Sequence, residues 1–351
     1  MKTIFSVIMG ICFSSMFAQV GIGTTNPEGA LDITSTNMGL VIPRVPSLEV
    51  LTDGNGNPPV NGTVIYDEFR NKTCFKINGK WACTGFDSTG SIVTEEEIPI
   101  ETNNCTYIKA STPGTSDTFG NLVKMSDDGN YLVVASPDED SNTTGINGDE
   151  TNNSAGSSVA VYVFVKSGAT WSQQAYIKAS NTNSNDYFGI SISITSDGSR
   201  IAVGAYGESS NATGINGDET NNSASFSGAV YVFSRSGTVW SQEAYIKASN
   251  TDSFDYFGNS VSINSDGTRL VSTAYTERSN ATGVNGDETN NALSGAGAAY
   301  VFTRSGTTWS QEAYLKASNT ESGDYFGIHT SISGDGTRIV VGAHNEDSNA
   351  T

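Results

Sequence analysis

The polar residues best suited to chemistry form a loop that occurs three times at a spacing of 69 residues. Its sequence is Asn-Gly-Asp-Glu-Thr-Asn-Asn, and a glutamate precedes each copy, with a fourth glutamate at the same spacing. Carboxylates and amide carbonyls are the oxygen ligands that calcium prefers. The candidate ligand or calcium residues are Glu139, Asn147, Asp149, Glu150, Glu208, Asn216, Asp218, Glu219, Glu277, Asn285, Asp287 and Glu288, and the fourth glutamate is Glu346.

The same loops fit a second interpretation, in which they are solvated turns with Asx-type caps. Asp140 begins a run whose oxygens are spaced like the start of a calcium loop, but Ser209 and Arg278 take its place in the next two copies. A positive charge opposes a bound cation, so a site at this position is not general to the repeats. We therefore assign no cofactor, and calcium stays open as an alternative that uses the loop aspartates with the neighbouring glutamates.

Catalytic motifs do not accompany these loops. The chain has two histidines, His329 and His344, and neither recurs in the other repeats. The sequence has no Gly-x-Ser-x-Gly, no His-Glu-x-x-His and no phosphate-binding glycine loop. Acidic pairs on loops are more often surface charge than a general acid and base. The sequence thus predicts a protein that is not an enzyme, and a catalytic module beyond residue 351 would not be visible in it.

The elements that carry these loops are strands. In the second repeat, Phe188 to Ile194 alternates apolar and small polar residues, which predicts a half-buried strand. Asp197-Gly198 supplies a tight turn, and Arg200 to Ala205 is apolar enough for an inner strand. Two further strands are expected at Ala229–Phe233 and Trp240–Ala248. Four antiparallel strands in one repeat describe a propeller blade.

The repeats also carry a family resemblance. Phe-Gly pairs stand at 119, 188, 257 and 326, each followed by Asp-Gly, and Val203-Gly204-Ala205 closes the pattern in the second copy. This order resembles the FG-GAP repeat of integrin-α-type β-propellers and covers residues 105–351. The resemblance implies binding through loops on one face of the propeller. Calcium loops common in that family are reduced here to plain turns at 126–129, 195–198, 264–267 and 333–336.

The predicted fold is therefore all-β: an incomplete β-propeller of about three and a half four-stranded blades, preceded by a small β module. The first two strands occur four times, but the last two follow only three of them. Since propellers close with roughly four to eight blades, we expect a fragment of a longer protein.

Recurring aromatic residues offer a second candidate surface. They would form a carbohydrate-stacking row or, as we prefer, pack between neighbouring blades, because aromatic residues dominate core burial. The members are Trp171, Trp240 and Trp309, with Tyr176, Tyr245 and Tyr314.

The first hundred residues differ from the repeats. Residues 1–18 read as a secretory signal peptide, and residues 87–104 read as an acidic linker. Between them, residues 19–86 resemble the leading segment of secreted Bacteroidetes-type proteins and segments near phage-tail-fibre-like collars. Asn78-Gly79 predicts a hairpin that places Cys74 opposite Cys83, close enough for a disulfide. Cys105 is left over, either free or buried.

The net charge and the predicted export limit the kinds of partner that the chain could bind. The chain has 18 basic and 37 acidic residues and a net charge of −19, which opposes binding to nucleic acid or an anionic membrane. After the leader, no run is long and apolar enough to span a membrane. Asn-x-Thr sequons at Asn142, Asn211 and Asn280 would be glycan acceptors only in a host with that machinery.

We therefore predict a secreted or cell-surface binding or adhesion protein whose partner is a protein or glycan ligand. Two alternatives remain open. The chain is the non-catalytic front of a larger secreted enzyme, or it is a structural spacer at the surface.

Overall fold

The structure is a computed structural model that describes seven strands between Val20 and Glu96, with Thr63, and residues 107–347 except 116, 153 and 157. The predicted signal peptide and Cys105 lie outside the described residues, as does most of the predicted linker. The chain divides into two compact units between Cys105 and Thr106. Every regular element described is a strand, which confirms the all-β prediction. Within the described residues, no helix has the length and apolar character needed to cross a membrane.

Unit 1 (Met1–Cys105) contains a parallel strand pair and a five-stranded sheet. The pair is β1 (Val20–Ile22) with β2 (Leu31–Ile33). The sheet has the order β3 (Arg44–Val45), β4 (Val64–Asp67), β5 (Lys72–Ile77), β6 (Lys80–Phe86) and β7 (Ile92–Glu96). Its last strand, β7, extends this sheet into the segment that the sequence predicted as a linker, because it pairs with β6.

The predicted hairpin disulfide is confirmed. β5 and β6 pair in the expected register, with Cys74 opposite Cys83 and Ile77 opposite Lys80. The two cysteines form a disulfide with their Cα atoms 4.0 Å apart, and both are buried. The register follows from the two-residue turn, because the turn fixes which residues face one another across the hairpin.

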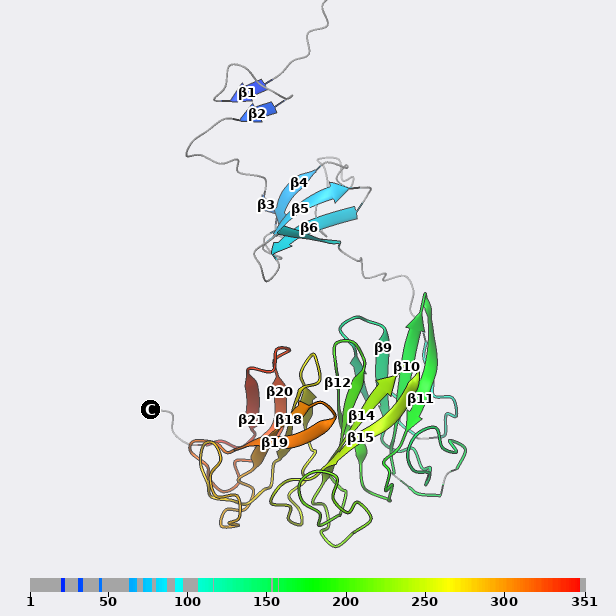
Figure 1. Ribbon diagram of the computed structural model, residues 1–351, viewed down its shortest axis with the longest axis vertical. Helices are drawn as coiled ribbons and strands as arrows, with labels where there is room; N and C mark the ends of the chain where they lie inside the picture. Colours follow the sequence, from blue (N-terminus) through cyan, green and yellow to red (C-terminus); the bar gives the residue numbers. More distant parts are fainter. Residues whose placement is uncertain are drawn as a thin grey trace, which may run out of the picture. The chain divides into compact units, whose positions relative to one another are not determined.

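Unit 2 (Thr106–Thr351) consists of three four-stranded antiparallel sheets followed by a two-stranded one (Figure 1). The first sheet holds β8 (Leu122–Met125), β9 (Tyr131–Ser136), β10 (Ala160–Ser167) and β11 (Thr170–Ile177). The second holds β12 (Phe188–Ile194), β13 (Arg200–Ala205), β14 (Ala229–Ser236) and β15 (Val239–Ile246). The third holds β16 (Val261–Ile263), β17 (Arg269–Ala274), β18 (Ala298–Ser305) and β19 (Thr308–Leu315). The last pair is β20 (Phe326–Ile332) and β21 (Ile339–Ala343).

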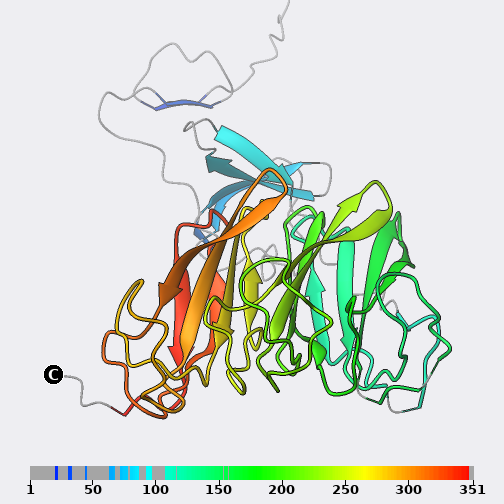
Figure 2. The same ribbon diagram turned by 60° about the horizontal axis from the view of Figure 1, so that its bottom comes forward.

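The four sheets are blades arranged along an open arc (Figure 2), as the sequence predicted. The first strands of consecutive sheets pack against one another in the order β8, β12, β16, β20. Buried side chains lie between neighbouring sheets, so each blade shares its core with the next. Trp240 contributes to this core, and its indole N–H donates to Gln174 of the preceding blade at 2.8 Å. The preferred interpretation of the recurring aromatics, packing between blades, is therefore confirmed in the second and third blades, whereas Trp171 and Tyr176 pack in a cluster formed by the first blade and the segment before it.

One detail of the predicted alternation is wrong. Ile190 was expected to face inward with Phe188 and Ile192, but it is 37% exposed whereas they are 0% and 2% exposed. A register shift between Phe188 and Ser191 interrupts the ladder of β12. Gly189 has a φ of +91°, a conformation open to glycine, so the Phe-Gly pair itself creates the bulge.

Candidate functional site

Three of the four recurring glutamates lie inside the blades, where each pairs with a lysine 39 residues later, whereas Glu346 is exposed and accepts the Asn319 side-chain amide at 2.6 Å. Glu139, Glu208 and Glu277 contact Lys178, Lys247 and Lys316 at 2.7, 2.7 and 2.8 Å. All six residues are at most 5% exposed. The lysines belong to the recurring Tyr-(Ile/Leu)-Lys-Ala-Ser motif, so two sequence signals that seemed independent form one buried contact.

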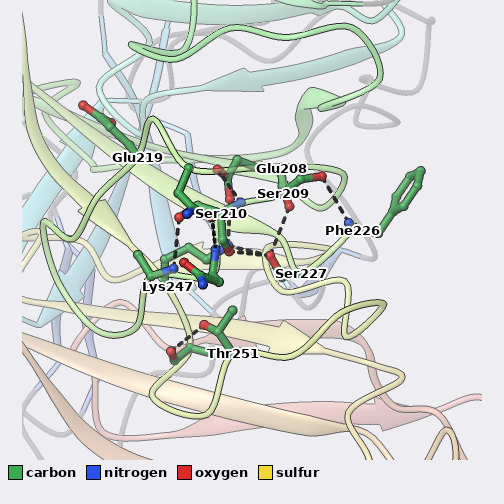
Figure 3. Close-up of polar contacts among 12 residues, drawn as sticks. Glu208, Ser209, Ser210, Glu219, Phe226, Ser227, Lys247 and Thr251 are labelled. Atoms are coloured by element: carbon green, nitrogen blue, oxygen red, sulfur yellow. Dashed lines mark hydrogen bonds and ion pairs between the residues drawn. The ribbon is translucent and has the colours of Figure 1, made fainter. Parts of the chain in front are cut away.

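Further hydrogen bonds complete the Glu208 site (Figure 3). The Lys247 ammonium also donates to the Ser227 hydroxyl at 2.7 Å, and the Ser210 amide donates to Glu208 at 3.0 Å. Asn181, from the loop after the preceding blade, donates its side-chain amide to Glu208 at 3.1 Å. The glutamate thus ties its own blade to the preceding one, which is a structural function.

Burial dominates the electrostatics of this site. It lowers the pKa of Lys247, while Glu208, Asp186 and Asp255 act in the opposite direction. Burial likewise lowers the pKa values of Lys178 and Lys316. A buried charge is tolerated only when it is paired and hydrogen-bonded, and each lysine meets this condition through its glutamate.

The loop asparagines are also structural. The side-chain oxygens of Asn147, Asn216 and Asn285 accept the amide N–H of Tyr176, Tyr245 and Tyr314 at 2.9–3.0 Å. The backbone N–H groups of the three asparagines donate in return to the backbone carbonyl oxygens of the same tyrosines. Each asparagine has a φ between +53° and +55°, which asparagine tolerates better than most residues. These contacts fasten the start of each loop to the fourth strand of its blade.

The loop aspartates are different, because they are exposed. The carboxylate of Asp149 accepts the Thr151 amide and hydroxyl at 2.9 and 2.6 Å. Asp218 and Asp287 make the same two contacts in their copies. These hydrogen bonds lower the pKa of all three aspartates. The loop therefore presents an ionised carboxylate whose direction is fixed by its own turn.

The loop glutamates attach each loop to the preceding repeat. Glu219 accepts the Ser180 hydroxyl at 2.5 Å, and Glu288 accepts that of Ser249 at 2.7 Å. Glu150 accepts the Ser111 hydroxyl, from the segment before the first blade, and also the Gln173 side-chain amide of its own blade at 3.1 Å. The predicted residues thus divide between glutamates and asparagines that connect the loop to strands and neighbouring segments, and exposed aspartates whose carboxylates accept hydrogen bonds within their own turn. No group of three or more His, Cys, Asp or Glu fit to hold a metal ion occurs in the part of the chain that is described.

Two sets of residues escaped the sequence analysis. The first set is the aspartate two positions before each Phe-Gly pair. The second set is the tyrosine directly before the pair in three of the four copies. Both recur with the period of 69. Asp186, Asp255 and Asp324 are at most 4% exposed. Burial raises the pKa values of Asp186 and Asp255 to about 7. The period of the Asp-Tyr-Phe-Gly motif was a signal that could have found them.

The chain order places the long loops and the blade-to-blade connections on one face. In an antiparallel four-stranded blade, the connection between strands two and three emerges at the same end as the connection to the next blade. In Figure 1 these segments gather at the lower end of unit 2, opposite the tight hairpin turns. We call this the loop face. It carries Asp149, Asp218 and Asp287 together with the Asp-Tyr-Phe-Gly motifs.

An open hollow of about 540 Å³ lies on the loop face of the second blade. Asn183, Asn185, Asn222, Tyr187 and Phe226 line it, together with buried Asp186. Figure 3 shows the Phe226 ring directed away from the Glu208–Lys247 contact. The hollow thus has aromatic walls and exposed amide groups.

Comparison with known families agrees with this geometry. The FG-GAP repeat family matches residues 171–233, 240–302 and 309–351. The chain is therefore an FG-GAP repeat protein, with four-stranded propeller blades in an open array. Residues 21–93 match a second family, described as a phage tail like trimerisation region. The sequence has no match among curated proteins.

The solved structures that resemble this chain have low sequence identity to it. A protein proposed to be a 6-phosphogluconolactonase from Bacteroides uniformis is 12% identical with a TM-score of 0.35, and the match covers 81% of this chain and 61% of that chain. The Cps50 (Swd1) β-propeller domain from Myceliophteria thermophila is 8% identical with a TM-score of 0.33, covering 76% and 61%. The chain spans about six-tenths of these proteins' lengths, and likenesses at such TM-scores carry no argument about function.

Proposed function

We propose that this protein is exported and acts outside the cell as a non-enzymatic binding or adhesion protein. The observation that carries the proposal is the repeated loop. Three nearly identical loops, held by the same buried ion pair, present Asp149, Asp218 and Asp287 on one face. Repeating one exposed surface three times suits multivalent binding, which repeat proteins commonly perform.

Two properties support an extracellular setting. The Cys74–Cys83 disulfide is the kind of bond that persists in oxidising compartments. The net charge of −19 keeps the protein soluble and turns away anionic surfaces.

The match of residues 21–93 adds a proposal about assembly. We propose that unit 1 joins three chains, so that three arrays of loops act together. Linked binding surfaces gain avidity without any new contact. Light scattering of the full chain tests this step, because a mass of about three chains supports it and a monomer of 36.8 kDa contradicts it.

The test of the binding function uses an array of immobilised glycans and extracellular proteins, probed with the full chain. The variant Asp149→Ala/Asp218→Ala/Asp287→Ala should bind more weakly than the natural chain. The matched control is Asp197→Ala/Asp266→Ala/Asp335→Ala, since these aspartates likewise accept the backbone N–H of the residue two positions later, in turns away from the loop face. Equal binding by all three proteins contradicts the loop site.

The same proteins distinguish the alternatives. If the natural chain binds nothing on the array, the structural spacer becomes the better interpretation. Melting with calcium and with a chelator tests the calcium alternative, because a metal that binds only the folded chain raises the melting temperature. A rise that the loop variant loses and the control keeps would place calcium at the loops.

A further inference from the structure

Five tyrosines on the loop face are in continuous ring contact across three blades. Their centroids lie 4.9 Å apart from Tyr187 to Tyr206, 5.6 Å to Tyr256, 5.4 Å to Tyr275 and 6.0 Å to Tyr325. All five rings are partly exposed. We call these residues the tyrosine row. Side chains of this size usually turn inward, so a series of partly exposed tyrosines needs an explanation.

The tyrosine row is distinct from the aromatic core. The strand tyrosines, such as Tyr231 and Tyr245, are at most 2% exposed. Tyr187, Tyr256 and Tyr325, by contrast, are partly exposed and have a backbone φ between +52° and +56°. A bulky residue in this region is an outlier whose backbone strain destabilises the fold. The chain keeps an aromatic ring at each of these positions despite that cost.

A pair of phenylalanines lies beside the row. Phe226 and Phe254 stack with centroids 5.9 Å apart, and Phe226 also meets Tyr256 at 5.7 Å. Both have positive φ, and the next repeat places Gly295 and Gly323, also with positive φ, at the same positions. Glycine therefore satisfies the backbone at these positions, so the phenylalanine rings are not needed to build the blade.

The hollow gives the row a polar partner. Tyr187 and Phe226 line it beside the amides of Asn183, Asn185 and Asn222, all exposed. An amide side chain both donates and accepts hydrogen bonds. A hollow of about 540 Å³ falls within the usual range for small-molecule sites. Apolar ring surfaces next to amides match a ligand whose rings have an apolar face and a rim of hydroxyl groups.

We infer that the tyrosine row and the adjoining hollow bind a neutral oligosaccharide. The inference rests on the proposed binding function and names its ligand class and its site. The partly exposed tyrosine rings offer apolar contacts to successive sugar rings, and the asparagines in the hollow bind hydroxyls of one terminal unit. The sugar is neutral because the chain has a net charge of −19, which repels an anionic glycan.

A peptide fits this surface less well. Peptides commonly bind by adding a strand to a free backbone edge. Beneath the row the backbone is already paired between blades, since the Phe254 amide donates to Ser225 at 2.8 Å and the Tyr256 amide to Phe226 at 3.0 Å. Recognition is left to side chains, and those present are rings and amides.

The test is native gel electrophoresis of the full chain through gels that each contain one soluble polysaccharide: a β-glucan, a xylan, a mannan, a galactan or a starch. We expect at least one to retard the natural chain. The variant Tyr206→Ala/Tyr275→Ala should lose roughly 10- to 100-fold in affinity, because two ring contacts disappear. Phe226→Gly/Phe254→Gly, which copies the next repeat, should fold normally and also bind more weakly.

Two controls make the result specific. Val239→Ala removes another exposed apolar side chain, 68% exposed, from a hairpin turn away from the loop face and should not change the retardation. Tyr206→Phe keeps the ring and should stay within about 3-fold of the natural chain, since stacking is retained.

Two results would overturn the inference: retardation by none of the five polysaccharides, or equal retardation of the natural chain and both aromatic variants. Its failure is separable from that of the binding function. A chain that binds a protein on the array but no polysaccharide contradicts only the sugar site, whereas a chain that binds neither contradicts both.

Discussion

Lys247 lies with its ammonium nitrogen 2.7 Å from a carboxylate oxygen of Glu208, and both side chains are 0% exposed. The contact joins the end of the fourth strand to the loop that follows the second strand of the same blade. Because the same pair occurs in each complete repeat, it attaches the loop to the fourth strand in all three complete blades.

Removing one partner of this pair should be costly. We expect Lys247→Met to lower the free energy of unfolding by about 3–5 kcal/mol, because Glu208 then stays buried without its counter-charge. The double variant Glu208→Gln/Lys247→Met should lose less than Lys247→Met alone, since no unpaired charge remains. Urea denaturation measures both.

The exposed pair of Arg269 with Glu312 is the control for that experiment. Its side chains are 38% and 36% exposed, so Arg269→Met should cost less than about 1 kcal/mol. Similar losses for Arg269→Met and Lys247→Met would contradict the importance of the buried pair.

The buried aspartates predict an unusual dependence of stability on pH. Burial raises the pKa of Asp186 and of Asp255 from 3.8 to about 7. The folded chain therefore binds more protons than the unfolded chain between these values, and the free energy of unfolding falls as pH rises through this window. The stabilisation is complete below about pH 4 and lost above about pH 7, with an upper size of about 4 kcal/mol per aspartate.

Chemical denaturation at several pH values from 4 to 8 tests this dependence. Asp186→Asn/Asp255→Asn should remove most of the fall, because asparagine does not titrate. The exposed loop aspartates, whose pKa values are lowered, act below pH 4 and do not interfere. A variant whose stability falls with pH as steeply as that of the natural chain would refute the assignment.

Much of this fold could be predicted because its signals are local. The Asp-Gly turns, the inner strand Arg200–Ala205 and the cysteine register each depend on residues close in the chain. The functions of Glu208 and Lys247 could not be predicted in this way. They lie 39 residues apart, and each recurs with the period of 69, but this period does not say that they meet, and burial of charge is decided by packing across the blade. Ile190 was misplaced for a similar reason, since a bulge at Gly189 overrides the alternation.

The disulfide should stabilise unit 1 alone. All four cysteines of the chain lie at or before Cys105, and Cys74 closes a short loop with Cys83. Cys74→Ala/Cys83→Ala should lower the stability of unit 1 by about 2–3 kcal/mol, chiefly by freeing the unfolded chain. Thermal unfolding followed with and without reductant tests this. Reductant should lower the melting of unit 1 in the natural chain and leave the variant unchanged, and a shift in the melting of unit 2 would contradict the prediction.

Gly204 provides the sharpest test of how the blades meet. A Cβ atom added there would overlap the carbonyl oxygen of Gly258 from the next blade, which also accepts the Ser191 hydroxyl at 2.9 Å. At Gly342, the same position two repeats later, an added Cβ would find no atom nearer than 3.9 Å. Gly204→Ala should therefore cost about 1–3 kcal/mol through overpacking, whereas Gly342→Ala should stay within about 0.5 kcal/mol.

Urea denaturation of the two glycine variants decides the matter. Ala135 and Thr273 occupy this position in the first and third repeats, so a side chain is not excluded by the strand itself. What excludes it at Gly204 is the approach of the Gly258 carbonyl, and the cost should therefore depend on the neighbouring blade. Equal stability of the two variants would show that the blades do not approach this closely at Gly204.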